Sequence, residues 1–136
     1  MKKIAITLCA MALVFQAAAQ EVAVSLKPKN TLLESAVFNW TTTTFDFGKI
    51  KVGVPVSHEF TFTNTGSVPL IITSVKASCG CTVTSYSKDP VQTNAQGFVK
   101  ATFNAASKGQ FTKTVTIQAN TEEGNVLLTI RGEVIE

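Results

Sequence analysis

Alternating apolar and polar residues fill most of the chain from residue 38 onward, and turn-forming residues interrupt them about every 8 to 12 positions. The clearest stretch covers residues 56–63, where Val56, His58, Phe60 and Phe62 share one parity and polar residues hold the other. This alternation is typical of a β-strand with one buried face, because successive side chains point to opposite sides of a sheet. The pattern therefore predicts an all-β protein.

Seven segments have this character or a strong β-propensity. They cover residues 38–47, 56–63, 70–77, 82–87, 97–103, 111–119 and 126–134. About seven short strands with regular turns predict an immunoglobulin-like β-sandwich. A β-barrel built from the same strands is the structural alternative, because both architectures alternate inward and outward residues.

The first nineteen residues have the composition of a secretory signal peptide. Lys2 and Lys3 precede an apolar run from Ile4 to Phe15, and Ala17-Ala18-Ala19 closes the segment. The apolar run is about 12 residues, shorter than the roughly 20 that a membrane-spanning helix needs. We expect cleavage before Gln20, which removes Cys9 and leaves no membrane anchor. The expected location is the periplasm or the extracellular space.

Cleavage would leave 117 of the 136 residues and lower the formal net charge from +3 to +1. We expect residues 20–37 to form a leader, a linker or an edge strand, and residues 38–136 to form one sandwich domain. A nearly neutral chain without a run of Lys and Arg argues against a nucleic-acid partner.

Four sequence elements resemble one known family. They are Phe45-Asp46-Phe47-Gly48, then Phe60-Thr61-Phe62-Thr63-Asn64-Thr65-Gly66, then Pro69-Leu70-Ile71-Ile72, then Ser78-Cys79-Gly80-Cys81-Thr82. The chain is similar, from about Phe45 to Val134, to the bacterial secreted family called domain of unknown function 1573. That family is itself similar to Hydin-type (ASH) immunoglobulin-like domains. The resemblance implies a seven-stranded sandwich in an exported protein and implies no activity.

Cys79 and Cys81 are the only cysteines left after the predicted cleavage, and three interpretations of them stay open. If the chain is extended there, the two side chains share a face and their Cα atoms lie about 6.6 Å apart, near the upper limit for a disulfide. Gly80 can adopt a bent backbone that brings the sulfurs together, so the pair is a candidate redox disulfide. Two thiolates on one face also suit Cu(I), whereas a complete zinc site lacks further ligands. The third interpretation is structural: two small apolar residues on the core parity of Val75, Ala77 and Val83.

Few other residues suggest chemistry. His58 lies on the apolar parity of its strand, where a hydrogen-bonded core or edge residue is expected more often than a ligand or a base. Hydrolase and nucleotide-binding motifs are absent from the sequence, so we identify no catalytic residue. The leading functional hypothesis is an exported, non-enzymatic binding or assembly module with a protein or cell-envelope partner. The alternative is a periplasmic thiol-redox or copper-handling protein that uses Cys79 and Cys81.

Overall fold

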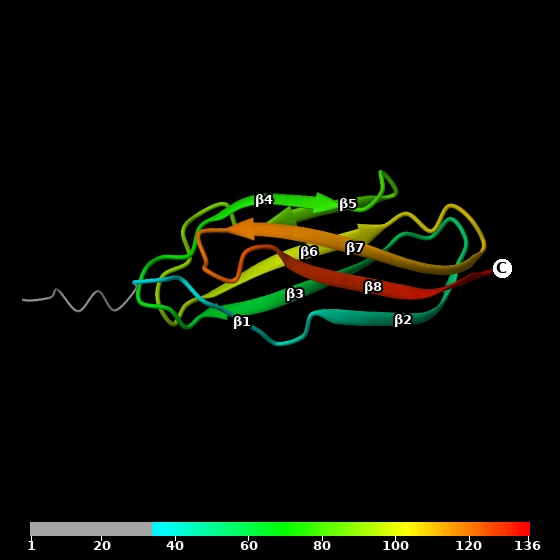
Figure 1. Ribbon diagram of the computed structural model, residues 1–136. Helices are drawn as coiled ribbons and strands as arrows, with labels where there is room; N and C mark the ends of the chain where they lie inside the picture. The colour runs from blue at the N-terminus through cyan, green and yellow to red at the C-terminus, as the bar shows by residue number, and fades with distance from the viewer. Residues whose placement is uncertain (1–33) are drawn as a thin grey trace, which may run out of the picture. The chain divides into compact units, whose positions relative to one another are not determined.

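The computed structural model describes residues 34–136, so the predicted signal peptide and most of the predicted leader lie outside the described residues. The described chain is all-β, with two four-stranded sheets (Figure 1). The strands are β1 (Phe38–Trp40), β2 (Thr44–Lys51), β3 (Val56–Asn64), β4 (Ile72–Ala77), β5 (Thr82–Tyr86), β6 (Gln96–Phe103), β7 (Gly109–Ala119) and β8 (Val126–Ile135). The predicted immunoglobulin-like fold class is confirmed, with eight strands in place of about seven.

Each sheet has its own strand order and its own pair of edges. The first sheet runs β1-β3-β6-β5, and the second runs β2-β8-β7-β4. All neighbouring strands are antiparallel except β2 and β8, which pair in parallel. The two sheets are hydrogen-bonded separately and remain open at their edges, so the barrel alternative is wrong.

The core is the apolar layer between the two sheets. Residues of one parity along β3, β6, β7 and β8 are buried, as the alternation predicts. The most deeply buried apolar side chains are Phe60, Phe62, Leu70, Val99, Val115, Ile117, Leu128 and Ile130. Two sheets that face each other in this way can exclude water only if both inner faces are apolar.

The predicted strand at residues 38–47 divides into two strands that belong to different sheets. β1 pairs with β3, whereas β2 pairs with β8. Between them, the Thr41 amide donates to the Thr61 carbonyl at 3.1 Å, and the Thr42 hydroxyl donates to the Thr44 carbonyl at 2.9 Å. These bonds supply partners to backbone groups that leave one sheet before joining the other, so the β-propensity of the threonine run does not keep the strand continuous.

Gly48 lies inside β2, although the sequence indicates that it marks the end of a strand. Its φ of 65° falls in the left-handed region, and the pairing register of β2 with β8 shifts between Asp46 and Lys49. Glycine accepts this conformation without a steric cost. The residue therefore forms a β-bulge within the strand.

The third predicted strand begins two residues later than expected. β4 starts at Ile72, and Leu70 forms an isolated bridge with Val91 through two 2.8 Å backbone hydrogen bonds. Asn120 holds the intervening chain: its Oδ1 accepts from the Ile71 amide at 2.7 Å, and its Nδ2 donates to the Pro69 carbonyl at 2.9 Å. These side-chain bonds replace the ladder bonds that a strand would make there.

Asn64 is a fully buried polar residue at the end of β3. Its Nδ2 donates to the carbonyls of Val68 and Val91 at 2.8 and 2.9 Å, and its Oδ1 accepts from the amides of Gly66 and Val37 at 2.9 and 3.3 Å. A buried amide is tolerated only when such bonds compensate for the lost water. One side chain thus joins the start of β1 to two later loops.

We predict that Phe60→Ala lowers the free energy of unfolding by about 3 to 5 kcal/mol, because Phe60 is completely buried between the sheets. Thr61→Ala is the matched control, since Thr61 is the next residue and its hydroxyl meets only the exposed Thr41 hydroxyl, at 3.2 Å. Its cost should stay below about 1 kcal/mol. Urea denaturation of both variants measures the difference, and equal costs would contradict the assigned parity of β3.

Candidate functional site

The chain crosses from the second sheet to the first between β4 and β5, and the two cysteines lie in that crossing. A disulfide joins Cys79 to Cys81, and their Cα atoms are 5.3 Å apart. This separation is shorter than the roughly 6.6 Å of an extended strand, because the backbone turns there. We call residues 78–82 the cysteine corner.

Hydrogen bonds hold the cysteine corner to both sheets. The Ser78 amide donates to the Thr114 carbonyl of β7 at 2.8 Å, and the Thr114 amide donates to Ser78 Oγ at 3.1 Å. On the other side, the amide of Asn104, just after β6, donates to the Cys81 carbonyl at 3.1 Å. The disulfide therefore spans a short turn whose two ends are already fixed.

Gly80 does not have the conformational role that the sequence suggests. Its φ lies outside the left-handed region, and a Cβ added to it would meet no atom within 4 Å. An L side chain at this exposed position is therefore compatible with the fold. Gly80 is exposed, between two partly buried cysteines.

The interpretation of Cys79 and Cys81 as core residues is only partly supported. Both side chains are partly buried, and Cys81 packs against the core. Val83, predicted to share the core parity, is 69% exposed, whereas Thr82 is buried. The turn at the corner changes which parity faces inward, so the alternation before the cysteines does not continue after them.

A hollow of about 230 Å³ adjoins the cysteine corner on the inner side. Cys81 lines it together with Lys108, Lys113 and the rings of Phe103 and Phe111, whereas Cys79 does not. Sequence reasoning missed this grouping. The available signal was Lys113, a lysine on the same parity as Phe111 and Val115.

Metal binding finds no further support in geometry. Within residues 34–136, no three side chains of His, Cys, Asp or Glu lie close enough together to hold a metal ion. The two cysteines are the only ligands that the corner offers. Nothing brings His58 toward them, since it stacks on Phe45 instead.

His58 is an aromatic packing residue with an unsatisfied nitrogen. Its ring stacks on Phe45 with centroids 3.7 Å apart and meets the edge of Phe60 at 4.6 Å. Its Nε2 is buried and has no hydrogen-bond partner, so the expected hydrogen bond of this residue is missing at that atom. Burial lowers the pKa of His58 below its ordinary value of 6.5, and the nearby Glu59 carboxylate opposes the shift.

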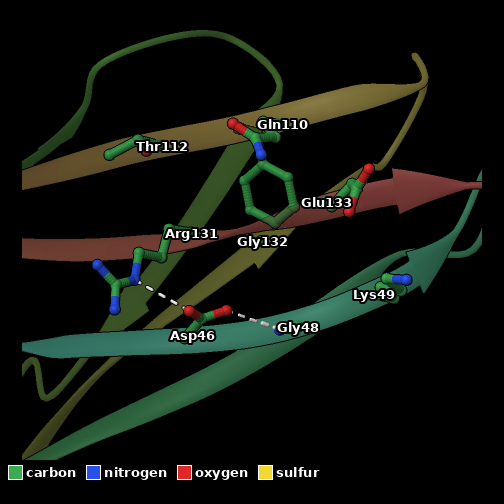
Figure 2. A pocket seen from close by; sticks show the side chains of 9 residues that line it. Asp46, Gly48, Lys49, Gln110, Thr112, Arg131, Gly132 and Glu133 are labelled. Carbon is green, nitrogen blue, oxygen red and sulfur yellow. Dashed lines mark hydrogen bonds and ion pairs between the residues drawn. The ribbon is translucent and has the colours of Figure 1, made fainter.

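A second hollow, of about 380 Å³, lies over β2, β7 and β8, and neither cysteine lines it (Figure 2). Asp46 accepts from Arg131 Nε at 3.0 Å and from the Gly48 amide at 2.8 Å. Lys49 and Glu133 occupy paired register positions beside them. The lining thus carries two positive and two negative side chains, of which Asp46, Lys49 and Arg131 are exposed and Glu133 is partly buried.

The fold and the corner together define the class: an immunoglobulin-like β-sandwich with a disulfide at a sheet crossing. No helix in the described part of the chain has the length and apolar character needed to cross a bilayer. The family described as "Protein of unknown function (DUF1573)" matches residues 38–134. The chain belongs to this family.

Solved structures confirm the fold at low sequence identity. A protein of unknown function from Porphyromonas gingivalis W83 is 15% identical with a TM-score of 0.67, over 79% of this chain and 50% of that one. The chain thus spans half the length of that protein. The ASH/PapD-like domain 7 of human CEP192 is 13% identical with a TM-score of 0.57, over 76% of this chain and 88% of that one. No curated protein matches the chain.

We predict that stability falls as the pH drops below about 6.5, because the lowered pKa of His58 means that the unfolded chain takes up its proton first. His58→Phe keeps the stacking on Phe45 and removes both the titration and the unpartnered nitrogen. It should raise stability by about 1 kcal/mol and abolish the His58 contribution between pH 7.5 and 5.5. Urea midpoints at the two pH values measure this, and equal pH dependence in both proteins would contradict it.

Proposed function

We propose that this chain is an exported, non-enzymatic binding or assembly module, and that a partner pairs with the open edge of β5. We call the side of β5 that faces away from β6 the β5 edge. Unpaired backbone groups on such an edge are a template for an incoming strand. The observation that carries the proposal is that β5 lacks the protection present on the other three edges.

Each of the other edge strands carries a feature that discourages pairing. β1 has three residues, too few for an extended ladder. β2 carries Asp46, Lys49 and Lys51 and has a bulge, and β4 carries Lys76 and a register shift between Ile72 and Ser74. Short length, charge and irregular register are the usual means of blocking edge-to-edge contact.

β5 has none of these features. It contains no charged residue and no proline, its register with β6 is continuous, and Val83 is largely exposed. At its two ends, Asn104 donates to Cys81 and Ser87 donates to Phe98. Hydrogen-bonded positions alternate in an antiparallel pair, so the backbone groups of Thr84 and Tyr86 face the β5 edge.

Photo-crosslinking in exporting cells tests this proposal. A photoreactive residue at Val83 should form covalent adducts, whereas one at Leu127, which is also exposed but lies on the central strand β8, should not. Thr84→Pro should reduce the Val83 adducts at least about fivefold, because it removes an outward N–H, and Thr84→Val, which keeps that N–H, should not.

Intact mass should show mature protein that begins at Gln20.

Two results would overturn the proposal. Adducts at Val83 that persist in Thr84→Pro would mean that backbone pairing is not involved. Absence of adducts at Val83 would mean that the β5 edge has no partner. If Thr84→Pro fails to fold, Ser85→Lys in the protein labelled at Val83 applies the same test, since it adds to exposed β5 the charge that protects other edges.

A second function, periplasmic thiol-redox or copper handling, is favoured by the accessibility of the cysteine corner. Both cysteines are only partly buried, and Cys81 lines a hollow that an external thiol could enter. Cu(I) would bind the same two sulfurs, but only in the reduced pair. The two chemistries therefore exclude each other at any one time.

We predict that protein recovered after aerobic export contains no free thiol and no copper, and that a mild reductant releases two thiols without unfolding. Thiol titration and metal analysis check this, with Cys79→Ser and Cys81→Ser as controls. Copper in a one-to-one ratio, lost in both variants, would support copper handling instead. Free thiols without copper would leave both cysteines as structural residues.

A further inference from the structure

Lys113 is a lysine on the inward parity of β7. Its neighbours on that parity, Phe111, Val115 and Ile117, are buried in the core, and Lys113 itself is partly buried. An ammonium group on this face loses hydration that an apolar residue would not need. The fold alone gives no reason for a cation there.

The register places Lys113 beside the cysteine corner. Ser78 and Thr114 are bonded just beyond the Ala77–Val115 pair that ends the β4–β7 ladder, and Lys113 is the residue of β7 that precedes Thr114. Lys113 also lines the hollow that Cys81 lines. Lys113 is therefore one residue from the position of β7 that is bonded to the corner, and it shares a cavity with Cys81.

Lys113 is also free of the ion pairs that the structure contains. Within residues 34–136, Lys108 pairs with Glu136 and Arg131 pairs with Asp46. Lys108 lines the same hollow, but its ammonium group pairs with the side-chain carboxylate of Glu136. Among the described residues, Lys113 has no carboxylate partner, so its charge is available to a thiolate.

We propose that Lys113 makes the cysteine corner a thiol–disulfide exchange site that accepts electrons from an external dithiol, with Cys81 as the sulfur attacked. The inference deepens the thiol-redox function proposed above and rests on it. Cations beside a cysteine favour the thiolate, which is the form that attacks and the form that leaves. Cys81 is the target because it lines the hollow and Cys79 does not.

The exchange balances in two steps. A thiolate of the dithiol enters the hollow and bonds to Cys81 Sγ, while the bond between the two cysteines breaks and its electron pair goes to Cys79 Sγ. The second thiol of the dithiol loses its proton and attacks its own sulfur in the mixed disulfide, which releases Cys81 as a thiolate. Two electrons pass to the cysteines, and the dithiol becomes a disulfide.

Two groups stabilise the thiolate that forms on Cys79. Lys113 supplies a positive charge from the position of β7 next to Thr114, which is bonded to Ser78 of the corner. The buried Thr82 hydroxyl, 3.9 Å from Cys79 Sγ, can donate a hydrogen bond to it. The leaving sulfur is therefore the one with both a cation and a donor at hand.

Lys113→Met tests the inference, with dithiothreitol as the dithiol probe and Lys100→Met, at an exposed lysine of β6 that does not line the hollow, as the matched control. Lys113→Met should slow reduction of the corner about threefold to tenfold. It should also raise, by about one pH unit, the pH at which iodoacetamide alkylates the reduced pair at half its maximal rate. Lys100→Met should change the rate less than twofold. Lys113→Arg, which keeps the charge, should restore both readouts.

Thermal melting separates these effects from a loss of fold. Lys113→Met should melt at or above the wild-type temperature, because Met suits the inward parity of β7 better than Lys. Should Lys113→Met melt early, Lys113→Gln removes the charge with a polar side chain and replaces it in the same measurements. A brief exposure of the wild type to mercaptoethanesulfonate, followed by acid quenching and peptide mapping, should find the mixed disulfide on Cys81.

Each outcome has one meaning. Unchanged rates and alkylation midpoints in Lys113→Met would overturn the role of Lys113, although the corner would still be a redox site. A mixed disulfide mainly on Cys79 would overturn the assigned direction of attack. Thiols that stay free in exported wild-type protein would instead overturn the thiol-redox function itself, and with it the inference.

Discussion

Burial of the apolar layer between the two sheets is the interaction on which the rest of the structure depends. The chain can build this layer only by crossing between sheets, and at each crossing backbone groups leave their ladder. A segment that crosses between the sheets lies beside each end of β6. Near the start of β6, Asn64 donates hydrogen bonds to backbone carbonyls of two loops. Just after the end of β6, the Asn104 amide donates to the Cys81 carbonyl of the cysteine corner. The two sites differ in chemistry because one is fully buried and the other meets solvent.

The sequence predicts the strands that have one buried face and does not predict where the chain changes sheets. The parity of Phe60, Val99 and Leu128 follows directly from alternation, because a central strand must direct one parity inward. The division of residues 38–47 between two sheets depends on bonds such as that from Thr41 to Thr61, twenty residues away. Propensity describes each residue with its neighbours and contains no information about such distant partners.

The candidate site was predictable to the same extent. The spacing of Cys79 and Cys81 identifies two sulfurs on one short segment, because proximity in sequence guarantees proximity in space. Lys113 is 32 residues beyond Cys81, and only the ladder between β4 and β7 brings it to the corner. A charged residue on an apolar parity was nevertheless visible in the sequence. The alternation predicts an apolar residue at position 113, and the chain has a lysine there. Positions that break a folding pattern in this way are often functional.

The cysteine corner and the β5 edge are adjacent, and this adjacency connects the two proposals. Cys81 immediately precedes Thr82, the first residue of β5, and its carbonyl is bonded to Asn104, in line with the β5–β6 ladder. A strand that pairs with the β5 edge would therefore end beside the disulfide. A cysteine at that end of the partner would be held near Cys81 by the backbone hydrogen bonds, which raises its effective concentration far above that of a free thiol. Pairing at the β5 edge would then select which protein thiols the corner exchanges with, while Lys113 would set how fast the exchange proceeds.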